Sequence, residues 1–281
     1  MTPPLPKCCI GLCVFNNEYG LPRVLKNIKK LESVLNIKII IFFDHSSDSS
    51  LELIYKYCDA LQLKYTLLIN DNPRSKIRTE NISNARNGIL EHIRENYSDY
   101  PYFAMMDSNK YSCVGKINPQ VITAMLERKD EWDSISFDRE AGYYDDWALS
   151  LEPLLYSFDH YNPREPVVQK MRVNKGNVLE SYKKNKPNEL IPVYSAFNGF
   201  ALYKSDIFLN CSYSADIDVQ LFPRDSIMNQ CIIVQQNIIP HFYGDCEHRK
   251  FHLEAIKKHG ARIRISLHSL FSIEEESAEL S

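Results

Sequence analysis

The sequence lacks the features that would assign it to several large classes of protein. No apolar run approaches the roughly 18 residues of a membrane-spanning helix, and residues 1–7 contain no basic segment leading into a signal core. The 281-residue chain carries a formal net charge of only -3, which gives no electrostatic reason to expect a nucleic-acid partner. We therefore expect a soluble, cytoplasmic protein without a membrane span and without nucleic acid as a partner.

Two further absences argue against particular kinds of site. The eight cysteines include no CxxC pair and no regular framework, so we expect mostly reduced core thiols rather than disulfides or a zinc site. No glycine-rich phosphate loop follows the first apolar run, which disfavours a nucleotidyltransferase. What remains is an ordinary globular composition, with 44% hydrophobic and 25% charged residues, on a chain long enough to bury a full core.

The first half of the chain alternates strand and helix patterns. Apolar runs predict strands at 8–15, 38–43, 65–69 and 102–106, and helical spacing predicts helices at 21–35, 49–61 and 79–96. Asp48 is the expected N-cap of the second helix. This β-α-β-α-β-α-β order predicts an α/β fold with a mostly parallel central sheet flanked by helices.

The second half has shorter strands, long polar connections and many aromatic residues. Prolines and lysines in 162–192 favour a loop or flap over the site, and two more apolar runs follow at 194–203 and 232–242. Asp245 and Gly260 are the expected cap and stop of a late helix. The acidic residues of 273–281 indicate a solvated tail.

The apolar run at 102–106 ends abruptly on Asp107 and polar neighbours. Ligands of open α/β sheets bind outside the carboxyl ends of the strands, so Asp107 is placed to meet a phosphate, a ribose or a metal. The alternative is an aspartate that only opens a turn. Asp44 leaves the second strand in the same way and could accept a hydrogen bond from a nucleobase. Asn16, after the first strand, could border the same pocket or serve as a turn former.

Arg86 falls within the apolar stripe of its helix, between Ile82 and Ile89. A buried guanidinium needs an anionic partner, and its fork matches a carboxylate or a phosphate. We expect Asp107 or a substrate diphosphate as that partner; the alternative is a long side chain that reaches solvent.

His248 and His252 lie four residues apart on the late helix and therefore share one face, as paired metal ligands do. Two histidines without a third ligand are a weak metal signal. If Asp107 approaches, it and one of these histidines could hold a divalent ion against a diphosphate. Glu247 beside it could be a general base or could orient a neighbour.

Several motifs occur in the order found in nucleotide-sugar glycosyltransferases of the GT-A fold. They are Phe15-Asn16-Asn17-Glu18, Phe43-Asp44, the segment 78–87 and Met106-Asp107-Ser108-Asn109. The later segments 144–149, 198–204 and 246–248 resemble the acceptor half of a subgroup found in large DNA viruses and microbes. The resemblance covers 8 to about 265, and it rests on the order and spacing of motifs that are weak one by one.

The resemblance implies a GT-A type, Rossmann-like domain over 1–265. It has a nucleotide-sugar-binding half at 1–113 and an acceptor-binding half of shorter strands and loops at 114–265. A strand remnant and an acidic tail follow at 266–281. The implied activity is transfer of a sugar from a nucleoside diphosphate sugar to a hydroxyl of a glycan or glycoprotein acceptor. The implied donor-binding residues are Asn16, Asp44, Arg78, Arg86, Asp107, Ser108, Asn109 and Lys110.

The family's Asp-X-Asp element falls on 107–109, so that Asn109 stands where relatives carry the second acid. The implied cofactor is manganese or magnesium, held by Asp107, Asn109 and His248. A neutral asparagine contributes less charge to a hard dication, which leaves metal dependence open. Lys110 could supply part of the neutralisation of the diphosphate, or it could point to water.

Inversion at the sugar would require a base for the acceptor hydroxyl, and the sequence does not order the candidates, which are Glu247, Asp145 and Asp146. Three aromatic residues could form a platform for a sugar or belong to the core: Tyr143, Tyr144 and Trp147. The alternative function is a catalytically silent sugar-nucleotide or glycan-binding protein of the same fold.

Overall fold

The computed structural model describes residues 4–110, 115–140, 142–155, 166–216, 218–234 and 244–272. The first half contains β1 (Lys7–Val14), α1 (Leu21–Leu31), β2 (Asn36–Phe43), α2 (Ser50–Ala60), β3 (Tyr65–Ile69), α3 (Arg78–Asn96) and β4 (Tyr102–Asp107). The second half contains β5 (Lys116–Ile117), α4 (Pro119–Glu127), η1 (Lys129–Glu131), β6 (Ser134–Phe137), α5 (Pro166–Asn185), β7 (Ile191–Val193), β8 (Phe200–Lys204), α6 (Ser205–Phe208), η2 (Val219–Leu221), α7 (Arg224–Val234), α8 (Glu247–His259), β9 (Ile263–Ser266) and β10 (Phe271–Ser272).

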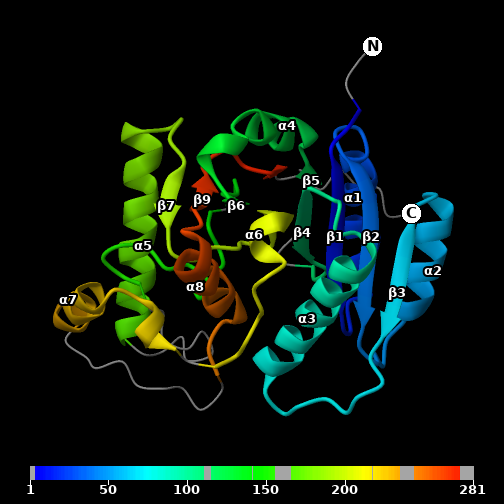
Figure 1. Cartoon of the computed structure of the whole chain (residues 1–281), viewed down its shortest axis with the longest axis horizontal. Helices are drawn as coiled ribbons and strands as arrows, with labels where there is room; N and C mark the ends of the chain where they lie inside the picture. The colour runs from blue at the N-terminus through cyan, green and yellow to red at the C-terminus, as the bar shows by residue number, and fades with distance from the viewer. Residues whose placement is uncertain are drawn as a thin grey trace.

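An eight-stranded sheet in the order β3-β2-β1-β4-β8-β6-β9-β7 runs through the molecule (Figure 1). The first four strands in this order pair in parallel. Strand β8 pairs antiparallel with both β4 and β6, and β6 pairs in parallel with β9. This mostly parallel sheet with flanking helices confirms the predicted α/β class. The carboxyl ends of β1, β2 and β4 meet at one edge, as the strand order 3-2-1-4 requires.

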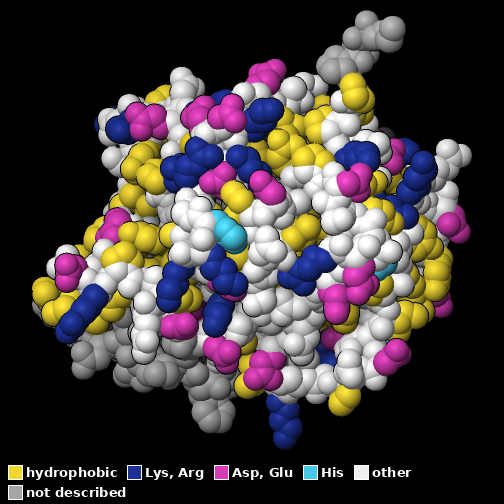
Figure 2. Space-filling model, viewed as in Figure 1, with side chains coloured by type: hydrophobic (Ala, Val, Ile, Leu, Met, Phe, Trp, Pro, Cys, Tyr) yellow, Lys and Arg dark blue, Asp and Glu magenta, His cyan; other side chains and the backbone are white. Residues whose placement is uncertain are grey.

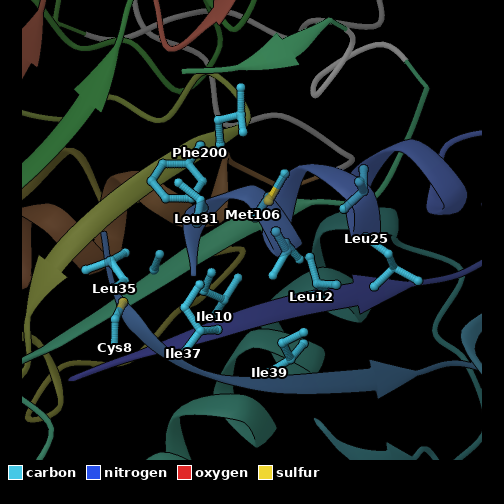
Figure 3. Close-up of a cluster of buried hydrophobic side chains, with 14 of the residues drawn as sticks. Cys8, Ile10, Leu12, Leu25, Leu31, Leu35, Ile37, Ile39, Met106 and Phe200 are labelled. Atoms are coloured by element: carbon cyan, nitrogen blue, oxygen red, sulfur yellow. The ribbon is translucent and has the colours of Figure 1, made fainter. Parts of the chain in front are cut away.

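Helices cover both faces of the sheet, because alternate residues of each strand point to opposite sides. On one face, Ile10 and Leu12 of β1 pack with Leu25 of α1 in a buried cluster (Figure 3). On the other face, Cys9 belongs to a cluster that includes Ile89 of α3 and residues of α6 and α8. Burial on both faces explains why these strands read as continuous apolar runs in the sequence.

The predicted elements of the first half lie within two residues of the observed ones, except for the first helix. That helix ends at Leu31, and the buried Leu35 belongs to the turn that leads into β2. Asp48 is not the N-cap of α2; Ser49 is, and the Asp48 carboxylate accepts from the Ser50 N–H at 3.0 Å.

The late helix also starts one residue later than expected. Cys246 is the N-cap of α8, and its N–H donates to Asp245 Oδ1 at 2.7 Å. The C-terminal end confirms the prediction, because Gly260 adopts the left-handed conformation with φ 64°. Glycine reaches this backbone region without steric cost.

The prediction of a loop or flap at 162–192 was wrong, because 166–185 form the helix α5. Met171, Lys175 and Leu179, spaced four apart, form its buried stripe. A lysine in the middle of that stripe interrupts the apolar spacing, so the helical pattern was missed. Parts of three predictions lie outside the described residues: the start of this loop at 162–165, most of the apolar run at 235–242, and the acidic tail at 273–281.

The described part of the chain offers no helix that combines the length and the hydropathy needed to cross a bilayer. The seven described cysteines are free thiols, and Cys113 lies outside the described residues. Figure 2 shows basic and acidic side chains interspersed over one face. At the C-terminal end of the described chain, β10 pairs with β5, and Leu270 and Phe271 are buried in the same core as β1.

Candidate active site

A cavity of about 510 Å³ opens at the carboxyl ends of β1, β2 and β4. This volume lies in the range of roughly 300 to 1,000 Å³ that small-molecule sites occupy. The inner face of α3, the segment 144–147 and the N-terminus of α8 complete its walls. The predicted site residues that line it are Asp44, Arg78, Arg86, Asp107, Ser108, Asn109, Asp145, Glu247 and His248.

Three predicted site residues are not among those that line this cavity: Asn16, Lys110 and Asp146. Asn16 is a turn former with φ 51°, and its Oδ1 accepts from the Ser47 N–H at 2.8 Å. The Lys110 ammonium lies 5.6 Å from the centroid of the Tyr19 ring. Asp146 turns away from this cavity and pairs with Arg172 of α5 at 2.6 Å.

The Asp44 carboxylate lines the cavity at the carboxyl end of β2 and could accept a hydrogen bond from a nucleobase. Its Oδ1 accepts from Asn70 Nδ2 at 2.9 Å, and its Oδ2 pairs with Arg74. The Arg74 guanidinium in turn stacks 3.4 Å above the centroid of the partly exposed Phe15 ring. A planar cation on an aromatic face, held by a carboxylate, forms a flat polar wall at this end of the cavity.

Arg86 is buried in the apolar stripe of α3, as predicted, and it joins two carboxylates. Its Nη2 lies 3.2 Å from Asp107 Oδ1, and its Nη1 lies 2.7 Å from Glu247 Oε1. The guanidinium also lies over the Phe197 ring, 4.6 Å from its centroid. Burial lowers the pKa of Arg86, but Glu247 and Asp107 more than offset this and raise it above its usual value. The group is therefore a permanent cation.

His248 is buried beside Arg86, and its Nε2 contacts the Arg86 guanidinium. Burial first, and then the charge of Arg86, hold the pKa of His248 well below its usual value, so the imidazole is neutral. A ring nitrogen in contact with a guanidinium is not available to a cation. Nε2 of His248 is therefore occupied by Arg86, and the role of His248 as a metal ligand beside Asp107 stays a prediction.

Asp107 and Asn109 present oxygen atoms of the kind that manganese and magnesium prefer. The Asp107 carboxylate already accepts from Arg86, and its Oδ2 accepts from the Tyr144 hydroxyl at 3.1 Å. Among the described residues, no group of three or more His, Cys, Asp or Glu side chains is arranged to hold an ion. An ion here would need oxygens from a bound ligand to complete its coordination.

Asp145 lines the cavity and has a raised pKa. The Ala148 N–H donates to its Oδ1 at 3.2 Å, and its own N–H lies 3.4 Å from Asn198 Oδ1. Asn198 also accepts from the Tyr144 N–H at 3.1 Å and donates to the Phe137 carbonyl at 2.8 Å. Burial raises the pKa of Asp145 to about 7, with the charges of Asp107 and Glu247 adding to the effect. A carboxyl poised near neutral pH suits general acid–base chemistry.

Sequence reasoning missed Arg74, Asn81 and Phe197 as cavity residues. Arg74 lies in the polar connection between β3 and α3, which has no periodic pattern. Its only signal is that this connection leaves the carboxyl end of a parallel strand. Phe197 was part of an apolar run and was indistinguishable from a core residue.

Among solved structures, the chain is similar to TarS of S. aureus with a TM-score of 0.51 and 12% identity, over 95% of this chain and 36% of that one. S. aureus TarS 1-349 in complex with UDP-GlcNAc matches with a TM-score of 0.49 and 13% identity, over 98% of this chain and 62% of that one. The mannosyltransferase PcManGT of Pyrobaculum calidifontis in complex with GDP-Man and Mn2+ matches with a TM-score of 0.47 and 10% identity, over 93% of this chain and 56% of that one. The likeness to TarS supports the GT-A fold and nothing finer.

The chain thus spans less than two thirds of the length of each of these three solved proteins. The comparison with curated protein sequences gives no match. A family model described as Glycosyl transferase family 2 matches residues 9–208, which is more than half of the chain. The match includes β1 to α6 and therefore most of the cavity, whereas Glu247 and His248 lie beyond it. The chain belongs to glycosyl transferase family 2.

Proposed function

We propose that this chain transfers a sugar from a nucleoside diphosphate sugar to a hydroxyl of a glycan or glycoprotein acceptor. The observation that carries the proposal is that Asp107, at the end of β4, and Asp145, with a pKa of about 7, line the same cavity. One carboxylate lies where ligands of α/β sheets bind, and the other is poised to accept a proton near neutral pH.

The donor nucleotide occupies the end of the cavity formed by β1 and β2. Asp44 and Arg74 meet the base there, with Phe15 behind the guanidinium. Arg78, at the start of α3, faces the cavity from an exposed position and supplies positive charge to the diphosphate. Arg86 acts differently, because its charge is already shared by two carboxylates; it positions Asp107 and Glu247.

Asp107 and Asn109 would hold a divalent ion together with the diphosphate. When bound, such an ion neutralises the charge that develops on the departing nucleoside diphosphate. Asp107 and Asn109 together bring one formal negative charge, so the ligand must supply most of the attraction for the ion. We therefore expect weak ion binding in the absence of nucleotide.

Asp145 is the base in this proposal. It takes the proton of the acceptor hydroxyl while the oxygen forms a bond to the anomeric carbon of the sugar. The bond from that carbon to the diphosphate oxygen breaks, and the nucleoside diphosphate leaves with the electron pair. Glu247 suits the role less well, because it is buried and paired with Arg86. Asp146 is paired with Arg172 outside the cavity.

We infer that the chain divides into a nucleotide-sugar-binding half at 1–113 and an acceptor-binding half at 114–265. The donor residues, which lie before residue 113 on α3 and at or after the ends of the strands, and the position of Asp145 beyond them support this division. The narrower likeness of the second half to a subgroup of large DNA viruses and microbes, and a cytoplasmic location, are part of the same proposal.

The test is the release of nucleotide from a panel of UDP-, GDP- and CMP-sugars, with and without manganese, as a function of pH. We expect wild-type protein to turn over at least one donor, with a rate that rises with pH through about 7 as Asp145 loses its proton. Asp145→Asn is expected to lower this rate by about 10²- to 10⁴-fold, the range for loss of a general base.

The matched control is Asp99→Asn, which removes an exposed carboxylate just before β4, at the opposite edge of the sheet. It should keep the wild-type rate and pH profile. Nucleotide binding without turnover of any donor would favour the catalytically silent alternative. Turnover that survives in Asp145→Asn would remove Asp145 from the mechanism.

A further inference from the structure

We propose that a second cavity, next to the first, binds a sugar ring of the acceptor; this inference rests on the proposed function. The second cavity has a volume of about 340 Å³ and lies between the segment 143–149 and α5. Its walls include Tyr143, Tyr144, Asp146, Arg172, Lys175 and Gly176. Its volume, at the small end of the range for ligand sites, suits a monosaccharide-sized group.

The two cavities share one wall. Tyr144 lines both of them, Asp145 lines the first and Asp146 lines the second. The Tyr144 hydroxyl reaches Asp107 in the first cavity at 3.1 Å. A ring in the second cavity therefore contacts Tyr144 and Asp146, the two sequence neighbours of the proposed base Asp145. In this arrangement one hydroxyl of the ring approaches Asp145 beside the Tyr144 ring.

Two buried basic side chains hold this dividing segment in place. Lys175 of α5 donates to the carbonyls of Asp146, at 3.1 Å, and of Leu149. Arg249 of α8 donates to the Trp147 carbonyl at 2.7 Å. Because α5 and α8 each fix the same short segment, the wall between the cavities is preorganised rather than a free loop.

The chemistry of the second cavity matches a sugar ring. Tyr143 and Tyr144 offer aromatic surface to its C–H groups. Arg172 Nε donates to Asp146 Oδ2 at 2.6 Å, so a carboxylate and a guanidinium lie side by side on the wall. Sugar hydroxyls can donate to the former and accept from the latter. Both neutral and acidic sugars are compatible with this pair, and the probes below separate them.

Gly176 is a second, independent indication. It lies in the interior of α5, where glycine is unfavourable relative to alanine. Apart from the backbone of the helix itself, no heavy atom of the described residues lies within 4 Å of a Cβ built there, so packing among those residues does not require a glycine. Gly176 lines the second cavity, and the missing side chain leaves that cavity open.

The test places a large side chain in the second cavity by substitution of Gly176. Saturation-transfer NMR is recorded on the full chain with UDP or GDP and manganese, using the methyl glycosides of glucose, galactose, mannose and glucuronic acid as probes. We expect at least one glycoside to bind wild-type protein and to bind Gly176→Phe at least ten-fold more weakly. The affinity for the nucleotide is the internal reference and should change less than two-fold. Preference for the glucuronide over the neutral probes would identify an acidic acceptor.

The matched control is Val173→Phe, which adds an aromatic ring to the same helix at a side chain that is 61% exposed. It should bind the glycoside as wild-type protein does. If thermal melting shows that Gly176→Phe does not fold, the decisive variant is Arg172→Gln. We expect it to bind the glycoside at least five-fold more weakly than wild-type protein does. Absence of glycoside binding in wild-type protein, or equal binding in the decisive variant, overturns the second site. Donor turnover without glycoside binding overturns only this site, whereas glycoside binding without donor turnover overturns only the transferase.

Discussion

At the residue scale, the buried cluster around Arg86 shows how far a single side chain could be inferred. The helical stripe of α3 predicted that this arginine is buried, and the expected partner was Asp107 or a substrate diphosphate; the structure places Asp107 Oδ1 3.2 Å from the guanidinium. Its second partner, Glu247, lies on α8, far away in sequence. No local pattern links α3 with α8, so only the tertiary structure shows that one cation joins the two carboxylates.

Removal of Arg86 should therefore cost more than a surface ion pair does. Arg86→Met leaves Asp107 and Glu247 without their shared cation, and loss of one partner of a buried pair typically costs about 3–5 kcal/mol. Glu247→Gln removes one of the two charges that Arg86 compensates. We expect the double variant Arg86→Met/Glu247→Gln to be less destabilised than the sum of the single variants, by about 0.5–3 kcal/mol in urea denaturation.

Lys7→Met is the reference for this cycle, because Lys7 and Asp99 form an exposed pair at the other edge of the sheet. Exposed pairs contribute little, so its midpoint in urea should stay close to that of wild-type protein. If the Arg86 and Glu247 variants were additive, the guanidinium would not be coupled energetically to Glu247.

At the scale of helices and strands, two helical glycines differ in the space around them. Packing leaves no room for a side chain at one of them and leaves room at the other. Gly88 of α3 faces Phe42 of β2, and a Cβ there would lie 2.8 Å from the ring. At Gly176 of α5, no heavy atom of the described residues outside the helix's own backbone lies within 4 Å of such a Cβ. We expect Gly88→Ala to destabilise the fold, because overpacking costs about 1–3 kcal/mol and the gain in helix propensity offsets at most about 1 kcal/mol of it. Gly176→Ala should stabilise it by up to about 1 kcal/mol through helix propensity.

Thermal melting of the two variants side by side checks both signs. A stabilised Gly88→Ala would mean that α3 does not pack closely on β2. A destabilised Gly176→Ala would mean that α5 is not helical at this position or is covered there by another group.

The same scale explains which elements could be predicted. Strands β1, β2 and β4 are buried on both faces and therefore read as apolar runs, whereas the edge strand β3 is only partly buried; the helices between the strands bury regular stripes. Helix α5 was missed because Lys175 lies in its buried stripe, where it donates to two backbone carbonyls. A buried polar contact of this kind breaks the period on which a sequence prediction depends.

At the scale of the whole molecule, the first cavity needs residues from both halves of the chain. Asp44 and Asp107 come from the parallel strands, Asp145 from the connection after β6, and Glu247 from α8. The carboxylates at strand ends were predictable from the topology, because parallel strands place their carboxyl ends at one edge. Arg74 and the separation of Asp145 from Asp146 were not, because loop conformation decides them.

We expect the first cavity to bind the nucleoside diphosphate of a sugar donor. Calorimetric titration of UDP and GDP into wild-type protein and into Asp107→Ala, each with manganese and with EDTA, measures this binding. One of the two nucleotides should bind wild-type protein with manganese. That affinity should fall at least ten-fold in Asp107→Ala and at least ten-fold in EDTA. Absence of binding by both nucleotides, or equal affinity in wild-type protein and Asp107→Ala, would contradict it.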